Sequence, residues 1–96
     1  MSTYHAALMD ASTGVKQSYA FQAPADLFHL SAADIVDRFI DTLGSYGGGL
    51  GPLFYELDSA VMKRDPQVVM ATGFFDIGPA GMPFAVMISS QFAGRL

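Results

Sequence analysis

The chain of 96 residues contains no cysteine and no tryptophan. The missing cysteines exclude disulfide frameworks, thiolate catalysis and cysteine-ligated zinc or iron–sulfur sites. They also fit a cytoplasmic protein, which is the compartment that we expect. No apolar run approaches the roughly 20 residues that a membrane-spanning helix needs. No charged segment followed by an apolar stretch marks the N-terminus, so we expect no signal peptide.

Charge is also scarce. Charged residues make up 15% of the chain and apolar residues 51%, whereas ordinary globular domains carry about 25% charge. Five basic residues are scattered among nine acidic ones, which gives an acidic protein with a net charge of −4. Without a basic stripe, we expect neither nucleic acid nor a membrane surface as partner. So little charge in a small domain indicates many small surface residues, apolar surface covered by another chain, or both.

The clearest structural signal is the segment 31–43, where apolar residues recur at intervals of three and one. This spacing places them on one stripe of an α-helix. Ser31 is a suitable N-cap, and Gly44 can end the helix in a left-handed conformation. We therefore predict one amphipathic helix over 31–43. Its apolar residues are Ala32, Ile35, Val36, Phe39, Ile40 and Leu43.

Five further segments have the sequence patterns of β-strands. In most of them bulky apolar side chains alternate with small or polar ones, and one segment is apolar throughout. The first two are joined by a Ser-Thr-Gly turn and predict a hairpin. The third has a helix over 54–64 as its alternative, but its aromatic residues and its alternation favour a strand. The fourth is apolar on both faces, which is typical of a central strand. The five predicted strands span 4–10, 15–22, 53–63, 68–77 and 84–92.

These elements predict the order ββαβββ. Because strands joined by tight turns pair antiparallel, the predicted fold class is α+β. We expect a single domain over 1–96, in which one amphipathic helix packs on a mainly antiparallel five-stranded sheet. Five of the nine residues from Gly44 to Pro52 are glycine, so we expect a mobile loop at 44–52.

One helix of about 20 Å can cover only one face of such a sheet. We assign the bulky phase of the strands to the helix side, which leaves small residues and methionines, with almost no charge, on the other. Another segment of the chain could cover that face, namely the connection 23–30 or the glycine tract. A partner chain could cover it, most simply a second copy in a two-fold dimer. It could also form a shallow apolar ligand pocket. The expected interface residues are Met9, Met62, Phe75 and Met87, with Tyr46 as an aromatic anchor at the glycine loop.

Four side chains are candidate polar groups of a ligand site: His5, His29, Glu56 and Asp58. The two histidines do not have the spacing of a zinc motif, so we expect no metal. Glu56 and Asp58 lie two residues apart and would point the same way on a strand. Paired carboxylates can perform acid–base chemistry, although their alternation with apolar residues is more typical of a solvated strand face.

No other motif indicates catalysis or a cofactor. The glycine tract follows a helix and has no nearby lysine, unlike a phosphate-binding loop, and no Gly-x-Ser-x-Gly nucleophile motif is present. We therefore predict a small acidic non-enzymatic interaction module. It would self-associate or bind a protein partner through its charge-poor sheet face or an edge. The alternative is a small-molecule-binding domain or small enzyme, with a pocket between helix and sheet or at a dimer seam.

Overall fold

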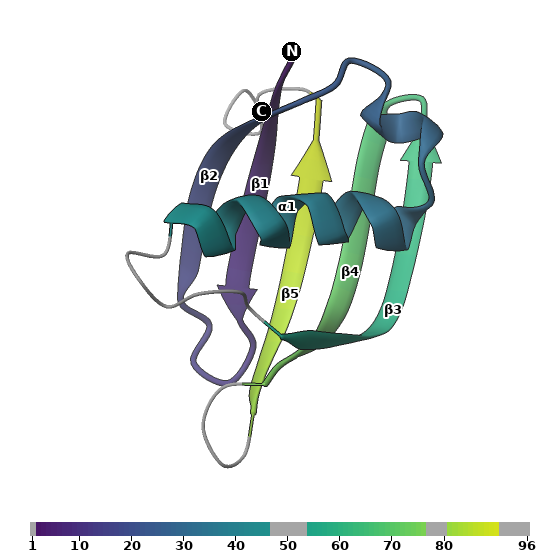
Figure 1. The fold of residues 1–96 in the computed structure, drawn as a ribbon. Helices are drawn as coiled ribbons and strands as arrows, with labels where there is room; N and C mark the ends of the chain where they lie inside the picture. The colour runs from purple at the N-terminus through teal and green to yellow at the C-terminus, as the bar shows by residue number, and fades with distance from the viewer. Residues whose placement is uncertain (1, 47–53, 77–80, 91–96) are drawn as a thin grey trace.

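The computed structural model describes residues 2–46, 54–76 and 81–90, with residues 44–46 described by their backbone only (Figure 1). One helix packs on a five-stranded antiparallel sheet, so the predicted α+β fold is confirmed. The third predicted segment is a strand and not a helix from Tyr55 onward, and residue 53 lies outside the described residues. In the described part of the chain, no helix is both long and apolar enough to cross a membrane. The elements are β1 (Ser2–Asp10), β2 (Lys16–Ala23), the 3₁₀ helix η1 (Leu27–His29), α1 (Ala32–Tyr46), β3 (Tyr55–Arg64), β4 (Gln67–Phe75) and β5 (Met82–Ser89).

The strand order in the sheet is β2-β1-β5-β4-β3, and all neighbouring strands are antiparallel. The first and last strands of the chain therefore pair at the centre, while β2 and β3 form the two edges. Helix α1 runs across the strands on one face of the sheet (Figure 1). The segment containing η1 packs on this same side, because Leu27 and Phe28 are buried in the core beneath the helix.

The core lies between α1 and the sheet. The predicted helical stripe is confirmed, since Ile35, Val36, Phe39 and Ile40 are all at most 2% exposed. The bulky phase of the strands also faces the helix as predicted, and aromatic rings join the two layers. The ring centroids of Phe39 and Phe21 lie 5.4 Å apart. Other strand residues in this core are Tyr4, Phe84, Val86 and Ile88.

Helix α1 begins as predicted but ends later. The Asp34 backbone N–H donates to Ser31 Oγ at 3.2 Å, which is the expected N-cap. The prediction that the helix ends at Gly44 is wrong, because α1 continues to Tyr46. A glycine in the last turn costs only about 1 kcal/mol relative to alanine and does not prevent helical geometry. The rest of the predicted loop 44–52 lies outside the described residues, as does the Tyr46 side chain.

The β1–β2 hairpin is closed by a four-residue loop. Asp10 accepts hydrogen bonds from Ser12 Oγ at 2.7 Å and from Ser12 N–H at 2.9 Å. These bonds, the side-chain one first, lower the pKa of the Asp10 carboxyl. The bonds therefore stabilise the turn at pH values above the ordinary carboxyl pKa. This stabilisation is lost as the pH falls through the lowered pKa of Asp10. Gly14 closes the loop at φ 78°, a left-handed conformation that favours glycine.

A β-bulge interrupts β3. Its register with β4 shifts between Leu57 and Ser59, which reverses the alternation of side chains along the rest of the strand. As a result, Ala60 and Met62 pack against the core on the helix side. This shift decides which β3 residues the other face of the sheet presents.

A hydrogen bond ties β3 to the helix. The Tyr55 hydroxyl donates to Asp37 Oδ1 at 2.9 Å. Burial first, and then this bond, raise the pKa of the Tyr55 hydroxyl above its ordinary value of 10.0. The bond therefore contributes fully to the stability of the fold at pH values below the ordinary tyrosine pKa. This contribution is lost as the pH rises through the raised pKa of Tyr55.

We predict that Tyr55→Phe lowers the free energy of unfolding by about 0.5–1.5 kcal/mol at neutral pH, because it removes one hydrogen bond and little packing. Urea unfolding of the parent and the variant measures the difference. The Asp37→Asn variant, which keeps a neutral acceptor, serves as the control and should lose less. An unchanged unfolding midpoint in Tyr55→Phe would show that the bond contributes nothing.

Candidate functional site: the open face of the sheet

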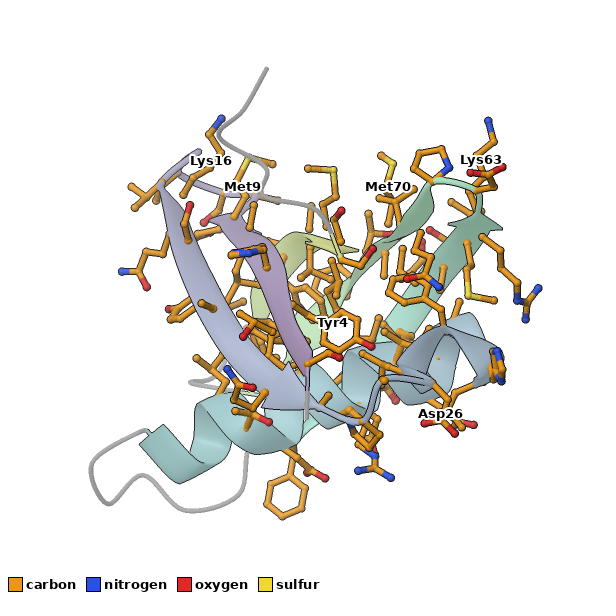
Figure 2. All side chains as sticks on the ribbon, turned by 90° about the horizontal axis from the view of Figure 1, so that it is seen from above. Tyr4, Met9, Lys16, Asp26, Lys63 and Met70 are labelled. Atoms are coloured by element: carbon orange, nitrogen blue, oxygen red, sulfur yellow. The ribbon has the colours of Figure 1, made fainter. Side chains whose placement is uncertain are left out.

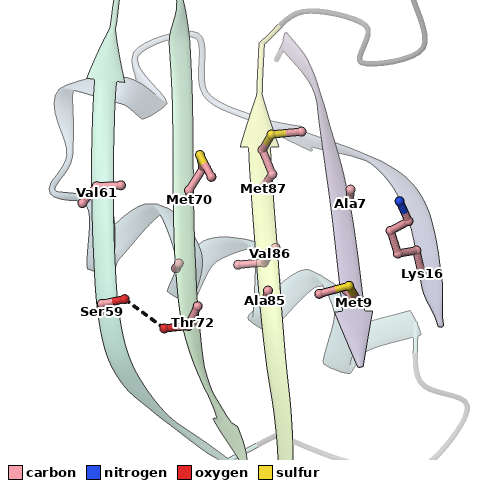
Figure 3. A pocket seen from close by; sticks show the side chains of 11 residues that line it. Ala7, Met9, Lys16, Ser59, Val61, Met70, Thr72, Ala85, Val86 and Met87 are labelled. Carbon is pink, nitrogen blue, oxygen red and sulfur yellow. Dashed lines mark hydrogen bonds between the residues drawn. The ribbon is translucent and has the colours of Figure 1, made fainter. Parts of the chain in front are cut away.

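The sheet surface opposite α1, here called the open face, carries two rows of side chains in register across four strands (Figure 3). Methionines and small residues form its centre. The upper row comprises Val61, Met70, Met87 and Ala7, and the lower row comprises Ser59, Thr72, Ala85 and Met9.

Large apolar side chains on the open face are exposed to solvent. Val61 is 64% exposed, Met70 54%, Phe74 51% and Met87 38%. A water-facing sheet surface normally carries polar and charged side chains at such positions. Val61, Met70 and Met87 are direct neighbours in one row across β3, β4 and β5. Phe74 lies on the same face of β4, beyond Thr72, and its partner on β3 is Glu56.

The open face is hollowed at its centre. A shallow depression of about 430 Å³ lies between the protruding methionines and the small side chains of Ala7 and Ala85. Its few polar groups include the hydroxyls of Ser59 and Thr72, which are hydrogen-bonded to each other at 2.9 Å. The depression is therefore an apolar surface whose central hydroxyl groups already have a partner.

Charge is confined to the margins of this face. Lys16 lies on the β2 edge and Lys63 on the β3 edge, and Figure 2 shows Met9 and Met70 between them. Glu56 is exposed near the start of β3, at the opposite end of this strand from Lys63. The two rows themselves carry no ionisable side chain. An apolar centre with a charged rim is the usual anatomy of a protein–protein interface.

The predicted interface residues divide between the two faces. Met9 and Met87 lie on the open face, as expected. The placement of Phe75 there is wrong, because its side chain is 2% exposed and its ring centroid lies 4.4 Å from that of Phe84 in the core. The placement of Met62 is also wrong, because the β3 bulge turns it toward the helix. Val61 takes its place on the open face.

The four candidate polar residues do not converge. His5 lies in β1, and His29 ends η1 beside the start of the helix. Glu56 and Asp58 are both exposed on β3, and Asp58 is the extra residue of the bulge, because the register shifts between Leu57 and Ser59. Among residues 2–46, 54–76 and 81–90, no group of three histidine, aspartate or glutamate side chains could hold a metal ion. The four candidates therefore lie on three different elements, and only Glu56 and Asp58 are close together in the chain.

Sequence reasoning missed Val61, Met70 and Phe74 as members of the apolar surface. One signal for the bulge was present, because an isolated glycine within a strand indicates a bulge or a close backbone approach. Gly73 is that glycine, and it lies opposite Leu57, where the register is about to shift. For β4, apolar residues on both faces left the direction of each side chain undetermined.

The connection 23–30 does not cover the open face. Its buried residues pack on the helix side of the sheet, so this alternative for the charge-poor surface is excluded. The glycine tract lies outside the described residues. Comparisons of this chain with protein-family models, with curated proteins and with solved structures find no match.

Proposed function

We propose that this protein is a small self-associating module, and that its open face packs against the open face of a second copy in a two-fold dimer. The observation that carries this proposal is the exposed apolar surface of Val61, Met70, Phe74 and Met87. A two-fold interface brings one patch against itself, so the patch must be compatible with its own copy. An uncharged centre meets that condition, because no like charges oppose each other there.

The area of the open face is sufficient for such an interface. Five strands at about 4.8 Å spacing and about eight residues each at 3.3 Å give roughly 600 Å² per copy. Two copies would therefore bury roughly 1,200 Å², which is the lower end of the range for specific protein–protein interfaces. A face of this size supports a dimer whose stability depends on protein concentration.

The shape of the open face is also compatible with packing against a second copy of itself. Met70 and Met87 protrude beside the hollow that Ala7 and Ala85 leave. Two stacked sheets lie about 10 Å apart and interdigitate their facing side chains. Methionine is flexible enough to fill an irregular gap in a second copy. The open face therefore offers both protrusions and a depression to its own copy.

The methionines allow the proposal to be tested within one molecule. We expect the methyl NMR signals of Met9, Met70 and Met87 to shift as the protein concentration rises, because these groups lie on the open face. The signals of Met62 and Met82 should remain in place, because both pack against the core. Shifts of all five signals together would indicate a global change instead, and no shift at any concentration would contradict the dimer.

The hollow supports a second candidate function, the binding of an apolar small molecule at the same face. The depression of about 430 Å³ falls within the usual size range of ligand pockets. The two candidates differ in their response to concentration. A fluorescent apolar probe such as anilinonaphthalene sulfonate should be displaced as the protein associates, because the dimer buries the face. Probe binding that is independent of protein concentration would favour the ligand site.

A further inference from the structure

The two edges of the sheet are protected to different degrees. The β3 edge carries a bulge and four charged residues: Glu56, Asp58, Lys63 and Arg64. It is also tied to neighbouring elements, because Tyr55 bonds to α1 and Arg64 Nε donates to the Phe28 carbonyl oxygen of η1 at 3.1 Å. Bulges, charges and covering elements are the devices that keep edge strands from pairing with other chains.

The β2 edge has fewer of these devices among the described residues. Its eight residues pair with β1 in one uninterrupted register. Lys16, at the start of the strand, is its one charged residue. Ser18, Ala20 and Gln22 are exposed. A long edge strand without a bulge and with almost no charge is a template for strand addition.

The hydrogen-bonding pattern shows which backbone groups point outward. The Asp10 N–H donates to the Val15 carbonyl oxygen at 2.9 Å, so these two residues form a hydrogen-bonded pair. In an antiparallel ladder such pairs alternate with pairs that make no hydrogen bond to each other. In β2, the N–H and C=O of the even-numbered residues are therefore directed away from β1. These residues are Lys16, Ser18, Ala20 and Gln22.

We propose that β2 pairs antiparallel with β2 of a second copy to form a continuous ten-stranded sheet. A two-fold axis normal to the sheet keeps both α1 helices on one side and joins the two open faces on the other. Pairing centred on Ser18 or Tyr19 places Lys16 opposite Ala20 or Gln22 of the second copy, so the lysines do not oppose each other. Centred on Tyr19, the pairing satisfies all the outward groups with about eight main-chain hydrogen bonds.

This contact goes beyond the face-to-face dimer and does not depend on it. The edge axis is normal to the sheet and the face axis lies parallel to it, so the two are perpendicular. When two such axes intersect, the assembly closes as a tetramer with dihedral symmetry. The mass of that tetramer would be four times the 10.2 kDa of one chain.

Amide hydrogen exchange of the unmodified protein tests the edge contact directly. We expect the amides of Ser18, Ala20 and Gln22 to become protected as the concentration rises. The amides of Tyr19 and Phe21 bond within the monomer to β1 and should be protected throughout. Unprotected amides at Ser18, Ala20 and Gln22 under all conditions would overturn the proposal, whatever the state of the open face.

A proline substitution provides the matched mutational test. Ser18→Pro removes an outward N–H and leaves the bonds to β1 in place, and proline is tolerated at such edge positions. In a Met87→Asp background, which opposes the face contact, we expect a mass of twice 10.2 kDa that Ser18→Pro lowers to that of one chain. Ser18→Ala keeps the N–H and should keep the mass. Circular dichroism establishes that each variant is folded, and an equal mass for the proline and alanine variants would contradict edge pairing.

Discussion

Met87→Asp is expected to halve the mass of the assembly while the fold remains intact. Met87 lies near the middle of the open face, between Ala7 on β1 and Met70 on β4. In the monomer the new carboxylate remains accessible to water, because the side chain at this position is 38% exposed. In the face-to-face dimer it would be buried without a partner, once in each copy. Burial of unpaired charge costs several kcal/mol, so we expect the dissociation constant to rise at least 100-fold.

Val15→Asp is the matched control for this change. Val15 is an apolar residue that is 60% exposed, but it lies in the turn region before β2 and not in the rows of the open face. The same charge introduced there should leave the mass unchanged. Light scattering on a sizing column and circular dichroism measure mass and fold in each variant. If Met87→Asp associates like the parent, the open face is not the contact surface.

Gly73→Ala is expected to lower the free energy of unfolding by about 2–3 kcal/mol, because it overpacks a buried site. A methyl group at Gly73 would fall on the backbone carbonyl of Glu56 in the neighbouring strand, and close to the Phe84 ring. Neither group can move freely, since Glu56 is paired with Phe74 and Phe84 is buried in the core. For a domain of this size, the melting temperature should fall by about 10 °C or more.

Thr72→Ala controls for the position in β4. Thr72 is the neighbouring residue, but its side chain is exposed on the open face. Its loss removes one exposed hydroxyl bond to Ser59 and should cost about 1 kcal/mol or less. Thermal unfolding of the two variants separates the two effects. If the two variants have the same melting temperature, Gly73 is not as close to the Glu56 carbonyl as the structure places it.

The helix could be predicted because its periodicity and its cap gave the same result. Apolar residues such as Ile35 and Phe39 recur with the helical period, and Ser31 stands where a cap is needed. Strand positions followed equally well from alternation and turn residues. The pairing of β1 with β5 could not be read in the same way, because contacts between distant segments leave no local pattern in the sequence.

The open face was predictable in kind but only partly in its residues. A lone helix and a low charge content were enough to indicate an uncovered apolar sheet surface. The prediction for Met62 was wrong because one bulge reverses every later side chain in β3. The prediction for Phe75 was wrong because β4 is rich in apolar residues on both faces, so Phe74 and Phe75 could not be told apart by hydrophobicity.

The mass of the protein in solution tests the central claim most directly. Light scattering on a sizing column, across a wide range of concentration, should give a mass that approaches at least twice the 10.2 kDa of one chain. A value near four times that mass would indicate that the open face and the β2 edge are both occupied. A constant mass of one chain at every concentration would contradict self-association, and would leave the open face to a different protein or to an apolar ligand.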